Sequence, residues 1–570
     1  MHASQPLRVP VGHDAARWST FHGEKTLVVA ARTVTSTVRV LECLPALLRG
    51  DEKVTVVFAY DPTSAFNDGV LDLLHDAGCR VMPWAQLSRI SPDLIVSASE
   101  NIEVPDGDCP VLVLPHGIGF QKFVPDSRST RERLSGLVPD PLLEAGRAWL
   151  TVSHPGQEEQ LLAAHPKASG HTLLVGDPCF DELRAGADDA EAYRRALGVG
   201  DEQRLVVVSS TWGATSLLGR LPHLPARLLS ALPCDEYRVA AILHPNIWSG
   251  HGAWQIRTLQ AAALDAGLML IPPVHAWRSA LLAASMVIGD HGSVTLYGAA
   301  LGKPVLLGAF GADAVPGTAV TDLGRSAPHL DPHGDLRGQI EETLRTHTPH
   351  RYAEIADRAF ADPGEALTRL RACVYQLMGQ PEPTASPPPV LAPPLPEPVG
   401  AAVTSWVVTT SVVESATGHP IVTLRRRPAA ACADIDEAPD TYVHLACDIQ
   451  ERDGRLTQSA SVLVRRTSPD TASAAVRWVR DTLDRFPGSL LTAAPVRGGT
   501  TVVGLRDGRV VEATATGSLG DDPGLAAAVV YSCLRAELAL DDTVATLRIG
   551  DVREEDVVVR LRPGLQGDGS

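Results

Sequence analysis

The stretch SMVIGDHGSVTLYGAALGKPVLLG, residues 285–308, has the pattern of a strand, a turn, a helix and a second strand. Its first apolar run ends at Ile288, and the turn that follows holds the small polar residues Asp290 to Ser293. A helix start exposes unpaired N–H groups and the positive end of the helix dipole, so small polar residues there can form an anion site. A plain helix cap is the alternative.

The same alternation of strand-like and helix-like segments occurs throughout the first 380 residues, where short runs rich in Val, Ile and Leu alternate with segments of helix length. Such continuous apolar runs are typical of strands buried on both faces of a parallel sheet. We predict an α/β fold with two tandem Rossmann-like domains, residues 26–195 and 196–380, which bind a ligand in the cleft between their carboxyl-end loops. Residues 1–25 form an N-terminal extension, and 351–378 are expected to be helical.

The composition changes after residue 380. The segment PEPTASPPPVLAPPLPEP, residues 381–398, holds nine prolines in 18 positions and predicts a semi-rigid linker over 381–400. Its PxxP spacing also fits an SH3-type ligand. Residues 401–570 predict a small α+β domain with helices at about 472–486 and 523–539 and a final strand pair. Hairpins are expected to turn at Asp453-Gly454 and at Asp507-Gly508.

The net charge, the cysteine pattern and the lengths of the apolar runs indicate which partners and which cellular compartment to expect. The 570-residue chain has a formal net charge of −17 and no long basic run, which argues against nucleic acid and anionic membranes as main partners. Nine cysteines without a CxxC pair or metal-ligand spacing fit reduced thiols and predict no metal. The sequence has no signal-peptide core and no apolar run long enough for an integral membrane segment, so we expect a cytoplasmic protein.

Four loops at predicted strand ends carry the candidate chemistry. In the first half, LPHGIGFQK places His116, Gly117, Gly119 and Lys122 directly after a strand. Glycines allow close backbone approach to a ligand, and a histidine there can accept a proton near neutral pH. A tight turn with a surface histidine is the alternative.

In the second half, VVSSTWG offers hydroxyls and a flexible backbone for a phosphate, at Ser209, Ser210, Thr211 and Gly213. An ordinary turn is the alternative there. AILHPNIW places His244 at a strand end, and the proline after it disfavours immediate helical continuation. For this single histidine, a helix cap or a buried hydrogen bond is the alternative to catalysis.

The opening stretch supplies the fourth loop. Asp290 ends the strand and can bind hydroxyls, while Gly292 allows backbone access. Ser293 and Thr295 begin the helix, whose N-terminus can bind phosphate. One turn would thus bind two different parts of a ligand.

The order of HG, GDPCFDEL, HPN and GDHGSVTLYGAALGKPVL resembles the CDP-glycerol glycerophosphotransferase family of GT-B fold, which extends teichoic-acid-like cell envelope polymers. The later motifs are also similar to the non-hydrolysing UDP-N-acetylglucosamine 2-epimerases. The likeness covers residues 110–310 well and extends over 26–378. It implies that His116 is the general base for the acceptor hydroxyl, that His244 contacts the donor phosphates, and that Ser293 with its helix start seats the pyrophosphate.

The sequence departs from the first family at two motifs. Its usual S-D-x-S-S is GDHGS here, so Gly292 replaces a serine and His291 intrudes. Its G-x-P-R-x-D has Cys179 in place of the arginine. The missing hydroxyl and cation imply either a different donor or a site that no longer turns over.

The leading hypothesis is a transferase that moves a glycosyl or polyol-phosphate group from a CDP- or UDP-linked donor to an acceptor hydroxyl. The family implies that residues 26–195 bind the acceptor, which is polymeric or lipid-linked, and that residues 196–380 bind the nucleotide donor. No cofactor or metal is expected, because a helix dipole and hydrogen bonds can stabilise the leaving nucleotide, helped by His244 if it is protonated, and the loops lack a DxD-type pair.

Two other functions stay open. Epimerisation of a nucleotide sugar would use carboxylates, for which Asp177, Asp181 and Asp290 are candidates. A nucleotide-binding scaffold with a decayed site would act through residues 401–570. In that region His419, His444 and Arg425–Arg427 show no catalytic spacing, and acceptor selection, self-association and docking of a protein partner are all open roles.

Overall fold

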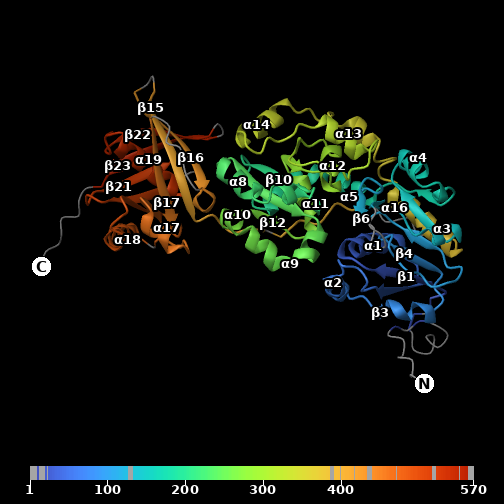
Figure 1. Cartoon of the computed structure of the whole chain (residues 1–570). Coiled ribbons are helices and arrows are strands. Elements are labelled where there is room, and N and C mark those ends of the chain that lie inside the picture. Colours follow the sequence, from blue (N-terminus) through green and yellow to red (C-terminus); the bar gives the residue numbers. More distant parts are fainter. Residues whose placement is uncertain are drawn as a thin grey trace.

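The computed structural model describes residues 9, 11, 20–21, 23–125, 132–384, 390–397, 399–415, 418–432, 440–469, 471–515, 522–550 and 553–562. Two parallel sheets and a closed barrel follow one another along the chain (Figure 1). The predicted mixed α/β class with parallel sheets is therefore confirmed. The finer arrangement as two tandem Rossmann-like domains of GT-B type stays a prediction.

The first sheet has seven parallel strands in the order β3-β2-β1-β4-β5-β8-β9. Its strands are β1 Lys25–Ala31, β2 Val54–Tyr60, β3 Val81–Pro83, β4 Leu94–Ser97, β5 Val111–Val113, β8 Ala148–Val152 and β9 Thr172–Leu174. A small antiparallel pair, β6 Phe123–Pro125 and β7 Glu132–Leu134, extends from the loop after β5. The helices of this half are α1 Val34–Leu47, α2 Val70–Asp76, η2 Trp84–Arg89, α3 Asp140–Glu144, α4 Pro155–Ala164 and η3 Pro166–Ala168.

The second sheet has five parallel strands in the order β12-β11-β10-β13-β14. These are β10 Arg204–Ser210, β11 Tyr237–Leu243, β12 Met269–Ile271, β13 Met286–Gly289 and β14 Val305–Leu307. Ser210 pairs with Leu243 and Val208 with Ile288, so these three strands end at one edge of the sheet. The loops that carry the predicted site residues therefore emerge side by side.

Helices cover both faces of the second sheet. They are α7 Leu217–Arg220, α8 Leu224–Ala231, α9 Pro245–Leu259, α10 Ala261–Asp265, α11 Ala276–Ala283, α12 Ser293–Ala300, α13 Ala319–Ser326 and α14 Leu336–Thr346. Two earlier helices, α5 Pro178–Ala185 and α6 Ala190–Ala196, which are joined by η4 Ala187–Asp189, also bury apolar side chains in the core of this sheet. The chain thus passes from the first sheet to the second between β9 and α5.

The helix expected over residues 351–378 is two helices, α15 Ala353–Asp357 and α16 Ala366–Met378. Between them Asp362 and Gly364 have φ values of 43° and 103°, and the proline between these residues cannot donate a backbone hydrogen bond, so one continuous helix is excluded. Leu370 and Val374 of α16 pack with α1 in a core of the first sheet. The chain therefore returns to the sheet from which it began.

The C-terminal region is a closed barrel with the strand order β15-β16-β22-β23-β21-β20-β19-β18-β17. The strands are β15 Ser405–Glu414, β16 Pro420–Pro428, β17 Thr441–Asp448, β18 Val462–Val464, β19 Leu491–Val496, β20 Thr500–Leu505, β21 Val510–Ala515, β22 Thr543–Ile549 and β23 Arg553–Leu561. Helix α19, Pro523–Arg535, contacts strands all around the barrel and is buried from Pro523 to Cys533. A helix that is apolar on every side needs such an enclosure.

The barrel confirms one predicted hairpin and corrects the other. Strands β20 and β21 are antiparallel around Asp507-Gly508, as predicted. At Asp453-Gly454 the hairpin prediction is wrong, because the Asp453 side chain accepts a hydrogen bond from the Arg455 amide and caps helix α17, Gly454–Ser459. Strands β17 and β18 are consequently parallel. Helix α18, Ala472–Arg485, and the final pair of β22 and β23 agree with the prediction.

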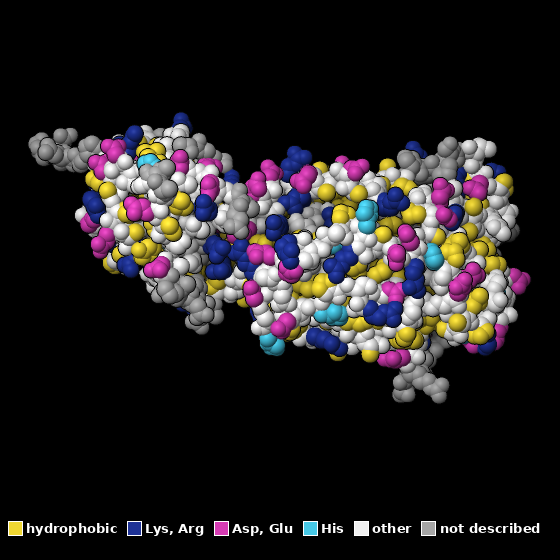
Figure 2. All heavy atoms as spheres, turned by 90° about the horizontal axis from the view of Figure 1, so that it is seen from above, with side chains coloured by type: hydrophobic (Ala, Val, Ile, Leu, Met, Phe, Trp, Pro, Cys, Tyr) yellow, Lys and Arg dark blue, Asp and Glu magenta, His cyan; other side chains and the backbone are white. Residues whose placement is uncertain are grey.

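A buried ion pair joins the barrel to the second sheet. Arg426 of β16 is 8% exposed, and its Nε donates to Asp235 at 3.0 Å while its Nη1 donates to Asp522 at 2.7 Å. Lys and Arg side chains also gather on the surface at this junction (Figure 2). The barrel is thus fixed to the second half of the chain by a specific contact as well as by the linker.

The linker expected over residues 381–400 stays a prediction. Its described residues 390–397 contain no helix or strand, and Pro393 and Pro394 contact the second half of the chain. There the Tyr193 hydroxyl donates to the Pro393 carbonyl at 2.6 Å, and the Ser279 hydroxyl donates to the Pro394 carbonyl at 2.7 Å. Within the described ranges, no helix is long and apolar enough to cross a membrane.

Candidate functional site

A cavity of about 470 Å³ lies between the loops at the carboxyl ends of the two sheets. Most residues singled out in the sequence line it, namely His116, Gly117, Gly119, Lys122, Ser209, Ser210, Thr211, His244, Gly292 and Ser293. Three lie elsewhere. Gly213 is an exposed turn residue with φ 96°, and Asp290 and Thr295 are 1% and 0% exposed behind the cavity wall.

The two halves of the cavity touch at Gly117 and Ser293. The amide of Ile118 donates a hydrogen bond to the Ser293 hydroxyl at 3.2 Å. A Cβ atom built on Gly117 would lie 2.8 Å from the Ser293 Oγ, so only glycine allows this approach without displacement. The loop that holds His116 and the start of α12 are therefore in direct contact.

His116 is oriented by a backbone carbonyl. Its Nδ1 lies 3.2 Å from the carbonyl oxygen of Ala98, and because a carbonyl only accepts, Nδ1 must carry the hydrogen. In the neutral ring Nε2 is then the nitrogen with the free lone pair. This is the tautomer that a general base requires.

A carboxylate that the sequence analysis missed lies near His116. Glu100, in the loop after β4, lines the cavity and pairs with Arg133 at 2.8 Å. Burial favours a raised pKa for Glu100, but Arg133 and His116 outweigh it and hold the pKa below its usual value. Glu100 is therefore ionised and can stabilise a positive charge on His116. Its only sequence signal is an acidic residue at a predicted strand end.

His244 caps helix α9. Its Nδ1 accepts a hydrogen bond from the Asn246 amide at 3.1 Å, which leaves the hydrogen on Nε2. Burial, together with the charges of His116 and Lys122, lowers the pKa of His244 to about 3. The ring is therefore neutral near pH 7, and the charge stabilisation that required a protonated His244 is not available. What it can offer a ligand is the Nε2–H group.

Asp290 holds the loops of the second sheet together. Its Oδ2 accepts from the amides of Thr211 at 2.9 Å and Leu217 at 2.8 Å, and its Oδ1 accepts from Gly292 at 2.9 Å. Burial raises the pKa of Asp290 against the effect of these bonds. Because its oxygens serve the chain's own amides, the arrangement does not fit the expected binding of substrate hydroxyls.

His291, the residue that intrudes into the motif, ties this loop to the next one. Its Nδ1 accepts from the Gly311 amide at 3.1 Å, and its Nε2 lies 3.0 Å from the Asp313 carboxylate. Asp313 also pairs with Lys122 at 3.2 Å, and Lys122 donates to the Trp212 carbonyl at 3.2 Å. Lys122 thus links the two halves of the chain at the rim of the cavity.

The start of α12 remains open for an anion. Its N-cap, Gly292, makes no side-chain capping bond, so the first amides of this helix are not satisfied by a cap. Ser293 and Thr211 place hydroxyl groups beside this helix start and the facing strand end. Such a combination is suited to a phosphate.

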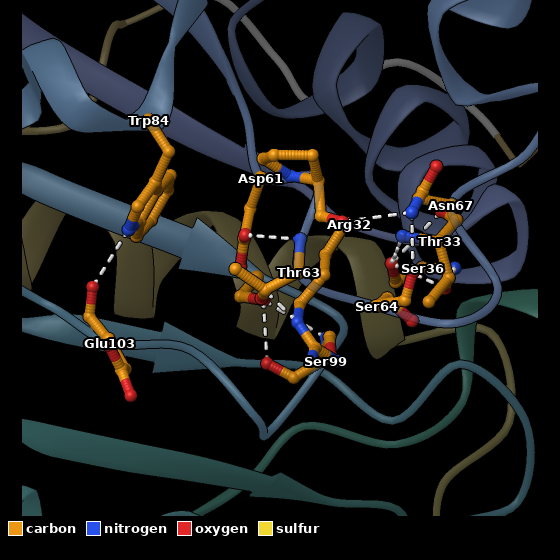
Figure 3. Close-up of polar contacts among 12 residues, drawn as sticks. Arg32, Thr33, Ser36, Asp61, Thr63, Ser64, Asn67, Trp84, Ser99 and Glu103 are labelled. Carbon is orange, nitrogen blue, oxygen red and sulfur yellow. Dashed lines mark hydrogen bonds and ion pairs between the residues drawn. The ribbon is translucent and has the colours of Figure 1, made fainter.

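Arginines from the first and second halves also line the cavity, and none of them belongs to a sequence motif. Arg32 follows β1 and pairs with Asp61 at 3.3 Å, and the Thr63 amide donates to the same carboxylate at 2.9 Å. Figure 3 shows these residues together with Ser99 at the carboxyl ends of the first strands. Arg278 of α11 pairs with Glu42 at 2.8 Å.

Within the described residues, no cluster of His, Cys, Asp and Glu side chains is placed to hold a metal ion. The cavity instead offers amides, hydroxyls, imidazoles and guanidinium groups. These groups bind anions through hydrogen bonds and charge.

No protein-family model and no curated protein matches this chain. Among solved structures, the wall teichoic acid polymerase TagF is 11% identical, with 62% of this chain and 89% of that chain covered and a TM-score of 0.41. A glycosyltransferase from Rickettsia africae ESF-5 is 11% identical, with 63% and 99% covered and a TM-score of 0.37. The UDP-GlcNAc 2-epimerase from Neisseria meningitidis, bound to UDP-GlcNAc, is 14% identical, with 62% and 100% covered and a TM-score of 0.39. The structure is thus similar, at low identity, to members of both families that the motifs resemble.

Proposed function

We propose that this protein is a transferase of GT-B type that takes a nucleotide-activated donor, of the CDP-glycerol kind, and transfers its polyol-phosphate or glycosyl group to an acceptor hydroxyl. The observation that carries the proposal is the contact between Ile118 and Ser293. It brings a histidine with a free Nε2 and an uncapped helix start into one cavity, and a transferase needs both a base and an anion seat.

The chemistry follows from these positions. With a CDP-glycerol-like donor, the acceptor oxygen attacks the phosphorus of the transferred group and a new P–O bond forms. The P–O bond to the nucleotide breaks, and its electron pair leaves on the oxygen of CMP. His116 Nε2 takes the acceptor proton, while the α12 amides, Ser293 and the Nε2–H of His244 stabilise the leaving phosphate. A glycosyl donor would react at its anomeric carbon and release the nucleoside diphosphate.

The carboxylates considered for epimerisation are engaged elsewhere, which favours the transferase. Asp177 accepts from the Cys179 amide at 2.8 Å and from the Tyr297 hydroxyl at 2.6 Å. Asp181 accepts from the amides of Gly364 and Ala366 at 2.6 and 3.0 Å. These two groups and Asp290 lie outside the cavity lining.

Calorimetric titration of CDP-glycerol, CDP, UDP-N-acetylglucosamine and UDP into the wild type, Ser293→Ala and His244→Ala tests the donor site. Ser169→Ala, an exposed substitution of the same kind, is the matched control. We expect one nucleotide series to bind and both site variants to bind it at least about tenfold more weakly, since each loses a hydrogen bond to a charged group.

Analysis of the reaction products then distinguishes a transferase from an epimerase and from a nucleotide-binding scaffold. Transfer to a hydroxyl acceptor, with release of CMP or a nucleoside diphosphate, supports the proposal, whereas a changed sugar without an acceptor indicates an epimerase. Nucleotide binding with no turnover over a broad donor and acceptor panel favours the scaffold. Absence of binding in every series removes the donor site.

A further inference from the structure

One face of α1 points into the cavity. Thr35 and Arg39 are four residues apart, which places them on one side of the helix, and both line the cavity. This face belongs to the first half of the chain, on the His116 side. The anion seat at α12 belongs to the second half.

Arg39 is a buried cation without a partner. It is 6% exposed and lines the cavity, yet within the described residues its guanidinium makes no hydrogen bond and no ion pair. A buried guanidinium with unused N–H groups is costly, because those groups lose their bonds to water. One turn before it, the hydroxyl of Thr35 is also buried and has no hydrogen-bond partner in the described chain.

The carboxylates around Arg39 already accept hydrogen bonds from other groups. Asp177 caps α5 and accepts from the Tyr297 hydroxyl, and Glu42 is paired with Arg278. Burial disfavours the charge on Arg39, but the negative groups around it hold its pKa well above the ordinary value. The guanidinium is therefore charged, and its hydrogen-bonding capacity faces the cavity.

We propose that Arg39 and Thr35 form a second anion-binding subsite, which holds a phosphate or carboxylate group of the acceptor. The inference rests on the proposed function, because it takes the α12 seat as the donor's place. The fork of guanidinium N–H groups matches either anion, and the Thr35 hydroxyl adds a donor from the same helix face. Such a subsite would orient the acceptor hydroxyl from the side of the cavity that also holds His116.

Phosphate binding to the full chain tests the subsite. Inorganic phosphate, and acetate at matched ionic strength, would be titrated calorimetrically into the wild type, Arg39→Met, Thr35→Val and Arg49→Met. Arg39→Met keeps an unbranched stem of similar length and removes the charge, and Arg49→Met makes the same change at an exposed position just after α1. Each titration would be repeated with the α12 seat saturated by CDP or UDP.

We expect the wild type to bind one of these anions with nucleotide present, and Arg39→Met to bind it at least about tenfold more weakly. Thr35→Val should weaken binding severalfold, and Arg49→Met should match the wild type. Binding of phosphate or of acetate tells which anion the acceptor carries. Thr35→Val conserves volume, so it provides the comparison if Arg39→Met proves unfolded by circular dichroism.

Three outcomes would overturn the inference. They are no anion binding by the wild type, equal anion binding by the wild type and the α1 variants, and equal loss of nucleotide and anion binding in Arg39→Met. The last would assign Arg39 to the donor. If no nucleotide binds, the proposed function fails, and the titration without nucleotide still compares Arg39→Met with the wild type.

Discussion

The amide of Ile118 donates a hydrogen bond to the hydroxyl of Ser293, 3.2 Å away and 175 residues later in the chain. Through this contact the loop after β5 and the first turn of α12 face the same cavity. The approach requires the absence of a side chain at Gly117. The contact between the two loops can therefore be tested by adding a single methyl group at Gly117.

Gly117→Ala should separate the two loops, because its Cβ would lie 2.8 Å from the Ser293 Oγ. Overpacking of this kind costs about 1–3 kcal/mol, so nucleotide binding should weaken roughly tenfold or more. Calorimetry of the nucleotide that the wild type binds gives the measurement. Gly454→Ala is the control, since a Cβ there meets no atom within 4 Å. Unchanged affinity in Gly117→Ala would refute the role of this contact.

His116→Ala should abolish most turnover and leave donor binding intact. Proton transfer by a positioned base contributes about 10²–10⁴-fold to a rate, so kcat should fall by that factor. The assay is release of the free nucleotide in the presence of donor and acceptor. His350→Ala removes an exposed histidine and should behave as the wild type. Full turnover in His116→Ala would exclude it as the base.

His444 should make the barrel sensitive to acid. His444 is 4% exposed, and its ring centroid lies 4.1 Å from that of Tyr531, with the two rings tilted by 40°. Both ring nitrogens lack a hydrogen-bond partner within the described chain, and burial lowers the pKa of His444 to about 3. In the unfolded chain this histidine takes up a proton at about pH 6.5. The contribution of the neutral, buried ring to the free energy of unfolding is therefore complete above that pH and declines as the pH falls toward 3.

His444→Leu removes this titration. Between about pH 7 and pH 5 the variant should lose less stability than the wild type, by about 2 kcal/mol in the free energy of unfolding. Denaturant unfolding at both pH values provides the comparison, with His350→Leu as the exposed control. An identical pH dependence in wild type and His444→Leu would show that the ring is not buried as a neutral group.

Arg426→Met should loosen the barrel from the second sheet. The substitution leaves Asp235 and Asp522 without their guanidinium partner, and removal of one member of a buried ion pair costs about 3 kcal/mol. Denaturant unfolding should show the barrel separating at lower denaturant concentration than in the wild type. Arg425→Met, the same change at the exposed neighbour, should have little effect. Equal effects of both variants would argue against the junction.

Local sequence patterns predicted the strands of the parallel sheets well. They could not predict which polar side chains form hydrogen bonds within the protein and are therefore not available to a ligand. The apolar runs that end at Ser210, Leu243 and Gly289 are strands, because strands buried on both faces have a continuous apolar sequence. The same patterns could not reveal that Asp290 is consumed by three backbone amides. Two of these amides, those of Thr211 and Leu217, lie more than 70 residues away in the chain.

The motif departure at Cys179 illustrates the same limit. By sequence position the cation of the G-x-P-R-x-D pattern is absent, yet Arg278 of α11 donates to the Cys179 sulfur at 3.2 Å. Arg39 of α1 lies close enough to interact with the same group. The guanidinium groups near Cys179 thus come from two other helices. The spacing of residues within one motif could not predict this.

The return of α16 to the first sheet constrains how the cavity can open. The chain passes between the halves before α5, again between α15 and α16, and once more between α16 and Pro393. Asp181 of α5 accepts hydrogen bonds from Gly364 and Ala366, so the first two passages are held together. Any movement of one half against the other would have to keep these two passages joined while it separates the contacts that Lys122 and Ser293 make at the cavity.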